Sequence, residues 1–324
     1  MKRIAVLDDY QGVVAALPYW ARLDGRASLD VFRDTLKSEG ALAERLAPYE
    51  IVVAIRERTR FPASLLERLP RLELLALTGR NSGHVDVAAA TARGVLVTET
   101  AGSAAAAVEH TMALILALVR RIPREERALR EGHWQTSVGT ELAGKTLGVV
   151  GLGRIGGRIA AFGTFLGMQV LAWGPTLTAE RAADGGARFV TLETLLRESD
   201  VVSINTRLSD KTRGLIDAHH LAMMKPTAYL VNTARGPIVD EAALVAALRA
   251  RNIAGAALDV FDEEPLPPTH PLLALDNAVL TPHLGYVTRE AYDAFFGQAA
   301  DAIVSYLDGK TPPRALNPDA LQRR

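Results

Sequence analysis

The sequence predicts an α/β protein with two parallel sheets, and three observations point to this fold class. Short apolar runs alternate with helix-like stretches along the 324 residues. One of these runs leads into a glycine-rich turn that opens a helix. The last runs are each followed by an isolated polar residue, and parallel sheets carry their binding groups at such strand ends. The length of the chain suits two domains.

The first apolar runs predict a small parallel α/β domain. Its strand candidates are residues 2–7, 28–32, 51–55, 72–77 and 94–97, with helical stretches at 40–47 and 62–69 between them. The run 2–7 ends at Asp8 and Asp9, so it reads as a first strand and not as a signal peptide.

The later apolar runs predict a second, doubly wound sheet with helices between its strands. Its strand candidates are 145–150, 168–173, 201–204, 228–231, 255–260 and 278–280. A long helical pattern follows at 289–307, and the proline-rich segment from Thr311 is expected to be a loose end. The stretch 101–119 is rich in alanine and leucine but contains Glu109 and His110, which favours a buried helix over a membrane span.

A glycine loop occupies residues 151–156, directly after strand 145–150 and before a helix expected at 157–167. In this setting the Gly-x-Gly-x-x-Gly pattern predicts dinucleotide binding, with Arg154 and Ile155 inside the loop. Gly151 permits the tight turn, Gly153 lets the backbone approach a diphosphate, and Gly156 allows close packing of helix on strand. The helix N-terminus adds free N–H groups and a positive dipole end. The second sheet is therefore predicted to be of the Rossmann type.

Three polar residues follow the last predicted strands. They are Arg235 in Asn-Thr-Ala-Arg-Gly, Glu264 in Asp-Glu-Glu-Pro and His283 in Thr-Pro-His-Leu-Gly. A guanidinium binds a carboxylate substrate, an imidazole moves a proton, and an acid sets the charge and orientation of that imidazole. Each residue taken singly could equally be a structural turn or strand-end residue. Together with the glycine loop, they predict an oxidoreductase.

The chain resembles the D-isomer-specific 2-hydroxyacid dehydrogenases from about residue 51 to residue 306. The resemblance rests on the order and spacing of the glycine loop, the Asn-Thr-Ala-Arg-Gly run, the stretch 255–265 and the Thr-Pro-His-Leu-Gly run. It implies a Rossmann-type sheet at 101–286, inserted into a smaller flavodoxin-like α/β domain made of 1–100 and 287–324. The inserted part would bind the dinucleotide, and the smaller domain would be the substrate (catalytic) domain. The helix 101–119 would help to form a homodimer.

The resemblance also implies the reaction and the roles of the three polar residues. A hydride would pass between a nicotinamide cofactor and a 2-oxo acid or D-2-hydroxy acid. His283 would be the general acid and base, Glu264 its hydrogen-bond partner and Arg235 the group that binds the substrate carboxylate. Because a carboxylate partner favours the charged imidazole, this pair could hold the proton that the reaction needs.

Further contacts follow from the same resemblance. Asp259 would hold the nicotinamide carboxamide, although a strand-end turn residue is the alternative, and Thr233 and Ala234 would offer backbone groups beside the nicotinamide. Asn81, Ser82 and Gly83 lie in a polar loop where the family binds the substrate carboxylate, and Asn81 stands where many relatives have glycine. Arg56 and Arg58 would meet a phosphate or a second carboxylate, or would simply be solvated surface.

Two positions leave the choice between NAD and NADP open. The strand 168–173 should end in an acid that bonds the ribose 2′-hydroxyl, but Gly174 stands there. Arg207 replaces a proline of many relatives near the expected adenosine, where it could pair with a 2′-phosphate or stack on adenine. Asn205, where many relatives have histidine, has no functional interpretation.

The composition argues against nucleic acid, membrane and metal as partners. The chain has 37 basic and 37 acidic residues, so no basic footprint points to nucleic acid or to a membrane surface. It has no cysteine, which fits a cytoplasmic enzyme. Without cysteine and without a His-x-x-x-His spacing, no metal is expected. The competing function is a corepressor-like protein that senses a dinucleotide on the same fold.

Overall fold

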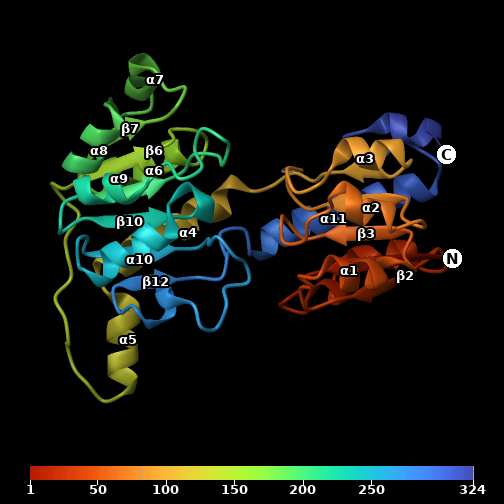
Figure 1. Ribbon diagram of the computed structural model, residues 1–324, viewed down its shortest axis with the longest axis horizontal. Coiled ribbons are helices and arrows are strands. Elements are labelled where there is room, and N and C mark those ends of the chain that lie inside the picture. Colours follow the sequence, from red (N-terminus) through yellow and green to blue (C-terminus); the bar gives the residue numbers. More distant parts are fainter. Residues whose placement is uncertain (81, 324) are drawn as a thin grey trace. The chain divides into compact units, whose positions relative to one another are not determined.

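The computed structural model describes residues 1–80 and 82–323, and the chain divides into two compact units (Figure 1). Unit 1 comprises Met1–Ser103 and Thr288–Arg324, and unit 2 comprises Ala104–Val287. Each unit contains one sheet in which all strand pairs are parallel. The predicted α/β class with two parallel sheets is therefore confirmed.

The sheet of unit 1 has five strands in the order β2-β1-β3-β4-β5. The strands are β1 (Lys2–Leu7), β2 (Ala27–Val31), β3 (Ile51–Ala54), β4 (Leu74–Leu77) and β5 (Leu96–Thr98). This is the strand order of flavodoxin-like sheets. The central strands β3 and β4 are buried over their whole length, as expected for a parallel sheet with both faces covered.

Helices cover both faces of this sheet. The short helices are α1 (Glu39–Leu46), α2 (Ala63–Glu67) and α3 (Val87–Ala92), with 3-10 turns η1 (Val14–Ala16) and η2 (Pro18–Leu23). Helices α1 and α2 bury leucines such as Leu46, Leu65 and Leu66 against one face. The long helix α11 (Arg289–Leu307) packs on β4 and η2, and it buries Phe295 and Phe296. The last helix of the chain therefore belongs to the first sheet.

The segment after Thr311 is not a loose end, and this expectation was wrong. Residues around Ala315 pair antiparallel with Thr98 at the edge of the sheet, and Leu316 N–H donates to the Val97 carbonyl at 2.8 Å. The buried side chain of Asn317 accepts from Val97 N–H at 2.7 Å and donates to the Val95 carbonyl at 2.9 Å. The turn η5 (Pro318–Arg323) then packs on α3. Backbone pairing at a sheet edge orders this segment, which its composition does not reveal.

The sheet of unit 2 has seven strands in the order β12-β11-β10-β9-β6-β7-β8. The strands are β6 (Thr146–Val150), β7 (Gln169–Trp173), β8 (Arg188–Phe189), β9 (Val201–Ile204), β10 (Tyr229–Asn232), β11 (Gly255–Leu258) and β12 (Ala278–Leu280). Counted along the chain, this is the Rossmann order 3-2-1-4-5-6 extended by one strand. The predicted Rossmann-type sheet is confirmed.

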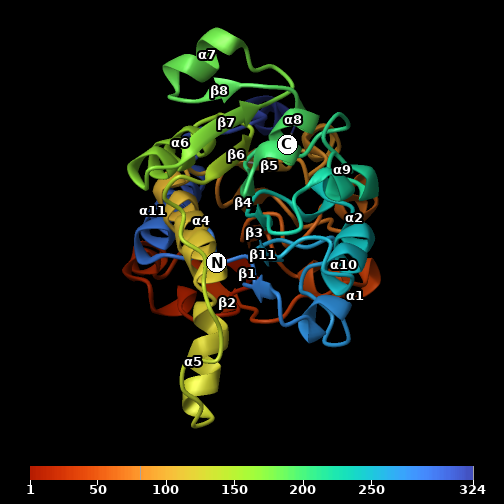
Figure 2. The ribbon, with the colours of Figure 1, turned by 90° about the vertical axis from the view of Figure 1, so that its left-hand side faces the viewer.

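Two layers of helices sandwich this sheet, as Figure 2 shows. One layer contains α4 (Ala104–Val119) and α6 (Gly156–Phe165), and the other contains α8 (Leu192–Glu198), α9 (Ala218–Met223) and α10 (Glu241–Arg249). Neighbouring strand residues alternate between the two cores: Val149 packs with α4 and α6, whereas Val150 packs with α8. This alternation follows from the twofold period of a strand. The remaining elements are α5 (Ile122–Arg130), α7 (Ala179–Asp184), η3 (Gly236–Ile238) and η4 (Pro271–Ala274).

Helix α5 extends away from the sheet of unit 2 and buries none of its residues (Figure 1). The chain returns to the sheet over residues 131–140. Glu125 holds this return, because its carboxylate accepts from Thr136 N–H at 2.9 Å, from the Thr136 hydroxyl at 2.7 Å and from the Ser137 hydroxyl at 2.5 Å. These bonds hold the pKa of Glu125 below its usual value, and the bond from Ser137 has the largest effect. We call α5 together with residues 131–140 the arm.

No helix within the described ranges is long and apolar enough to cross a membrane. Helix α4 begins at Ala104, three residues later than the stretch that suggested it.

Candidate active site

The glycine loop joins β6 to α6, and each of its three glycines is required or tolerated for a different structural reason. Gly151 has φ +98°, and a Cβ placed there would lie 2.7 Å from the backbone nitrogen of Thr206. A Cβ at Gly156 would lie 2.0 Å from the Gly151 carbonyl oxygen, so α6 can approach the loop only with glycine at this position. A Cβ at Gly153 would meet no atom within 4 Å. Gly153 is thus dispensable for packing and leaves open space above the loop.

That open space fits a dinucleotide diphosphate. Gly153 and Arg154 are exposed, and no side chain caps the start of α6, whose N-cap is Ile155. The first N–H groups and the positive dipole end of this ten-residue helix are therefore available to an anion.

Two further loops meet the glycine loop at the same edge of the sheet. A Cβ at Gly174, directly after β7, would lie 3.8 Å from the Cα of Gly151. Thr206, two residues after the end of β9, contacts Gly151 from the other side. Arg207 follows Thr206 and is exposed, and none of the residues in the ranges 1–80 and 82–323 bonds its guanidinium. Gly174 and Arg207 therefore flank the glycine loop.

Asn205 lies in the same loop as Arg207. Its side-chain nitrogen donates to the carbonyl and the hydroxyl of Ser203, both at 3.1 Å. Its side-chain oxygen is buried and has no hydrogen-bond partner among the described residues.

Asn232, the last residue of β10, holds the turn that carries Arg235. The buried Asn232 amide accepts from Ala234 N–H at 3.0 Å and donates to the Arg235 carbonyl at 2.9 Å. Gly236 allows the turn to pack on the loop after β11, because a Cβ there would lie 2.1 Å from the carbonyl carbon of Phe261. The Arg235 guanidinium donates to the Ala234 carbonyl at 2.5 Å. This role of Asn232 was not predicted from the sequence.

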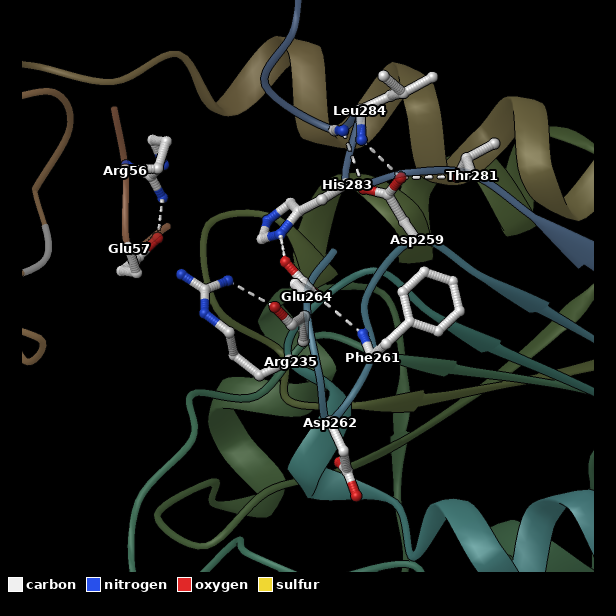
Figure 3. A network of polar contacts seen from close by, with 12 residues as sticks. Arg56, Glu57, Arg235, Asp259, Phe261, Asp262, Glu264, Thr281, His283 and Leu284 are labelled. Atoms are coloured by element: carbon white, nitrogen blue, oxygen red, sulfur yellow. Dashed lines mark hydrogen bonds and ion pairs between the residues drawn. The ribbon is translucent and has the colours of Figure 1, made fainter. Parts of the chain in front are cut away.

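Glu264 and His283 form a hydrogen-bonded pair, as Figure 3 shows. The Nδ1 atom of His283 lies 2.6 Å from Oε2 of Glu264, while Oε1 of Glu264 accepts from the Phe261 N–H at 3.0 Å. Both carboxylate oxygens are thus engaged. The His283 backbone is left-handed, with φ +54°, and its ring packs edge-on against Tyr286 at 5.4 Å between centroids. A non-glycine residue in this region at a strand end indicates a constraint on where its side chain points.

Asp259 follows β11, is 1% exposed and accepts four hydrogen bonds. The donors are the Thr281 hydroxyl at 2.6 Å, Leu284 N–H at 2.7 Å, Gly285 N–H at 2.9 Å and the His110 imidazole at 3.0 Å. Burial raises the pKa of this carboxyl, but the hydrogen bonds from His110 and Thr281 outweigh burial and hold the pKa below 3.8. The carboxylate is therefore firmly anionic and anchors the loop that carries His283.

Unit 1 contains the other residues singled out from the sequence. Arg56 has φ +55°, and its Nη1 would lie 1.7 Å from a Cβ at Gly79, so the guanidinium packs on the Gly79 backbone. Arg56 also pairs with Glu57 at 3.7 Å. Arg58 stacks on the Tyr10 ring at 4.3 Å and donates to the Asp8 carbonyl at 2.6 Å.

The polar loop after β4 is only partly described. Asn81 lies outside the described residues. Ser82 is half-buried and its carbonyl accepts from Val85 N–H at 2.9 Å, while Gly83 is exposed. No group of three or more His, Asp or Glu side chains in the part of the chain that the structure describes could hold a metal ion.

The family model for "D-isomer specific 2-hydroxyacid dehydrogenase, NAD binding domain" matches residues 112–285. The chain is also 44% identical to a glyoxylate reductase of Aeropyrum pernix over 275 residues, which are 82% of each protein. The chain belongs to the D-isomer specific 2-hydroxyacid dehydrogenases. It is therefore an oxidoreductase that uses a nicotinamide cofactor, and the glycine loop fits such a cofactor.

Solved structures of the same family share the fold of this dehydrogenase. A phosphoglycerate oxidoreductase from Vibrio cholerae o395 superposes with a TM-score of 0.91 at 40% identity, covering 95% of this chain and all of that one. A D-lactate dehydrogenase from Aquifex aeolicus, complexed with NAD and lactic acid, superposes with a TM-score of 0.78 at 27% identity, covering 99% and 98% of the two chains. The names of these relatives differ in the acid, so the substrate of this dehydrogenase does not follow from membership.

Proposed function

We propose that this protein reduces small 2-oxo acids to D-2-hydroxy acids, with His283 as the general acid. The observation that carries the proposal is the 2.6 Å contact between His283 Nδ1 and a Glu264 carboxylate whose other oxygen is fixed by a backbone N–H. Since Nδ1 is engaged, Nε2 is the ring nitrogen that can exchange a proton with substrate. Within the described part of the chain no residue bonds Nε2.

The residues divide the chemistry as follows. The bound nicotinamide cofactor supplies or accepts the hydride. His283 Nε2 protonates the keto oxygen during reduction and removes the hydroxyl proton during oxidation. Glu264 accepts the Nδ1 hydrogen, which holds the imidazole in one orientation and one tautomer. Arg235 binds the substrate carboxylate through two parallel N–H groups and so orients the keto carbon.

The cofactor is proposed to lie on the glycine loop, with Thr233 and Ala234 presenting backbone groups to the nicotinamide. We propose that NADP is accepted as well as NAD. Gly174 offers no carboxylate to repel a 2′-phosphate, and the exposed Arg207 offers a cation beside the same loop. A second arginine, Arg181, lies at the loop that begins with Gly174, since its guanidinium donates to the Thr176 carbonyl at 2.9 Å. Arg181 was not predicted from the sequence, because it falls seven residues after Gly174 and inside α7.

We propose glyoxylate and similarly small acids as substrates, as for the glyoxylate reductase relative. The two arginines that could meet a phosphate are already engaged by the protein: Arg56 by Glu57 and Arg58 by Tyr10 and the Asp8 carbonyl. A paired cation offers less charge to a second anionic group. Ser82 and Gly83, with Asn81, are proposed to bind the carboxylate through the polar loop after β4.

We further propose a homodimer formed through the arm. Its exposed apolar side chains are Ile122, Leu129, Trp134 and Val138. Trp134 is 77% exposed and Val138 is 87% exposed. The bonds from Glu125 order the arm in the absence of a partner, so these side chains are already in place for a second copy.

The test is a panel of 2-oxo acids assayed with NADH and NADPH in parallel. It includes glyoxylate, hydroxypyruvate, phenylpyruvate and phosphohydroxypyruvate. The highest kcat/KM is expected for glyoxylate or hydroxypyruvate, with turnover by both cofactors. Preference for phosphohydroxypyruvate would overturn the substrate proposal. Tight cofactor binding without turnover of any acid would favour the dinucleotide-sensing protein.

A further inference from the structure

Helix α4 contacts both loops that carry the catalytic residues, and it does so through two adjacent side chains. His110 reaches the loop of His283 by way of Asp259, and Thr111 reaches the loop of Arg235 by way of Thr233. Neither residue belongs to the catalytic trio. All of these residues lie within unit 2.

The contacts of His110 determine which of its nitrogens carries hydrogen. Its Nε2 lies 3.0 Å from Oδ1 of Asp259 and 3.0 Å from the hydroxyl oxygen of Thr281. The Thr281 hydroxyl donates its single hydrogen to Asp259 at 2.6 Å, so toward His110 it can only accept. Both neighbours of Nε2 are therefore acceptors, and Nε2 must be the donor.

Asp259 transmits this contact to His283. Its carboxylate accepts the backbone N–H groups of Leu284 and Gly285, which are the two residues immediately after His283. These two bonds hold the backbone just beyond the left-handed His283, whose φ of +54° few non-glycine residues adopt. A Cβ at Gly285 would lie 3.1 Å from Oδ2 of Asp259 and 3.9 Å from His110 Cδ2, so the loop packs closely between the two side chains.

Thr111 makes the corresponding contact with the other loop. Its buried hydroxyl donates to the Ala107 carbonyl at 2.7 Å, so its oxygen accepts from the Thr233 hydroxyl at 2.7 Å. Thr233 is two residues before Arg235. One turn of α4 thereby fixes the start of the Arg235 turn and the His283 loop relative to the same helix.

We propose that His110 and Thr111 are positioning residues. Through Asp259, His110 fixes the loop that carries the His283 imidazole. Through Thr233, Thr111 fixes the loop that carries the Arg235 guanidinium. The proposal rests on the roles proposed above for His283 and Arg235. In this arrangement Asp259 anchors a loop: its Oδ1 already accepts three hydrogen bonds, and its side chain is almost fully buried. Among the described residues, its Oδ2 accepts only the Gly285 N–H, at 2.9 Å.

The experiment compares His110→Leu with His110→Gln and Thr111→Val with Thr111→Ser, all in the full-length chain. Leucine removes the donor, whereas a glutamine amide nitrogen can take the place of Nε2 and donate to Asp259. Valine removes the hydroxyl that serine keeps. His219→Gln is the matched control, because His219 is exposed and on α9. Melting temperatures select the variants that fold.

The first readout is independent of activity and of cofactor. Amide hydrogen exchange of Leu284 and Gly285 in the free protein is expected to accelerate about tenfold in His110→Leu, since a hydrogen bond to their acceptor is lost. Exchange in His110→Gln is expected to stay near that of the original protein. Nitrogen shifts of the His110 ring are expected to report hydrogen on Nε2. Unchanged exchange in a folded His110→Leu, or hydrogen on Nδ1 alone, would overturn the proposal.

The second readout is catalysis. In His110→Leu and Thr111→Val, kcat is expected to fall about tenfold to a hundredfold, because small displacements of reacting groups are costly. The NADH dissociation constant is expected to change little, and glutamine and serine are expected to restore kcat. A large loss of NADH affinity with unchanged kcat would instead assign Asp259 to the cofactor and overturn the positioning role. If the unsubstituted protein reduced no 2-oxo acid, the proposed function would fail while the exchange result still tested the His110 contact.

Discussion

His283 meets Glu264 across a 2.6 Å contact between Nδ1 and Oε2, and the Phe261 N–H holds the other carboxylate oxygen at 3.0 Å. The acid is therefore oriented before any ligand arrives. An imidazole held this way presents Nε2 in one direction, which is the requirement for proton transfer at a defined substrate atom.

Replacing either member of this pair should lower turnover without unfolding the protein. His283→Ala is expected to reduce kcat by about a thousandfold, since general acid catalysis contributes roughly a hundredfold to ten-thousandfold. Glu264→Gln is expected to cost about a hundredfold, because its amide N–H₂ would face the Nδ1 hydrogen and reverse the imidazole tautomer. Steady-state kinetics with circular dichroism provide the measurement. Full turnover in a folded His283→Ala protein would refute the assigned role.

Three glycine-to-alanine substitutions in and beside the glycine loop should distinguish its role in packing from its role in cofactor binding. Gly153→Ala adds a methyl group that meets no protein atom, so stability should hold while NADH binds about tenfold more weakly, or ~1.4 kcal/mol. Gly156→Ala places that methyl group 2.0 Å from the Gly151 carbonyl oxygen and should cost about 3 kcal/mol of stability.

Gly157→Ala is the matched control for this pair, since a Cβ there also meets no atom within 4 Å. It should stabilise α6 by about 0.5 kcal/mol and leave the NADH dissociation constant unchanged. Titration of NADH fluorescence and urea unfolding measure the two quantities. Equal NADH affinity in Gly153→Ala and Gly157→Ala would mean that the diphosphate does not approach Gly153.

Cofactor choice should respond to Gly174 and Arg207. A Cβ at Gly174 would lie 3.5 Å from Leu177 and 3.8 Å from Gly151, which are ordinary contacts, so the Cβ of Gly174→Asp fits without rearrangement. Its carboxylate should lower kcat/KM for NADPH by about tenfold to a hundredfold through charge repulsion and should leave NADH turnover unchanged or improved.

Arg207→Ala is the complementary change. It should lower kcat/KM for NADPH about tenfold, because a charge-assisted bond is lost, and should spare NADH. Arg197→Ala removes the same charge from an exposed position on α8 and serves as control. Equal turnover of the two cofactors that persists in Arg207→Ala would remove Arg207 from cofactor recognition.

The sequence predicted both sheets because apolar strand runs and helical periodicity are local signals. It missed β8, since Arg188–Phe189 is only two residues long and exposed and leaves no apolar run. It also missed the order after Thr311, which depends on Asn317 bonding backbone groups more than 200 residues earlier in the chain.

The candidate site shows the same limit. Recognisable motifs contain Arg235, Glu264 and His283. The residues that hold these three side chains in place lie outside such motifs. His110 lies 149 residues before Asp259, and nothing in a helix rich in alanine and leucine indicates that one imidazole points at a strand end far along the chain. Such contacts depend on how the strands order themselves in the sheet, which local patterns do not encode.

Asp259 should make the stability of the protein depend on pH in acid. Its pKa in the folded state lies below the 3.8 of an unperturbed aspartate, so the folded state binds its proton less readily than the unfolded state. The carboxylate therefore contributes its full stabilisation above 3.8 and loses it as the pH falls through the folded-state value.

Asp259→Asn removes this dependence. The variant should be less stable by about 2 kcal/mol at neutral pH, because an amide cannot accept from all four donors. Its deficit relative to the original protein should shrink as the pH falls below 3.8, because the unfolded carboxyl takes up its proton there and the folded carboxyl follows at lower pH. Urea unfolding between pH 3 and pH 7 is the measurement. A deficit that stayed constant over that range would show that the carboxylate charge contributes nothing.

The arm should determine the oligomeric state. Trp134→Ser combined with Val138→Ser removes two exposed apolar side chains from residues 131–140. If these side chains pack against a second copy, dimerisation should weaken by at least about 2 kcal/mol, or roughly thirtyfold in the dissociation constant. The monomer itself should stay equally stable, because neither side chain is buried within the chain.

Phe165→Ser is the control for the arm substitutions. Phe165 is 84% exposed but ends α6, so its loss removes a comparable apolar surface from a different part of unit 2. Sedimentation velocity over a range of concentrations should show the monomer for the arm variant and the dimer for both Phe165→Ser and the original sequence. A dimer that survives the arm substitutions would have to use another surface, and the exposure of Trp134 would then need a different partner to explain it.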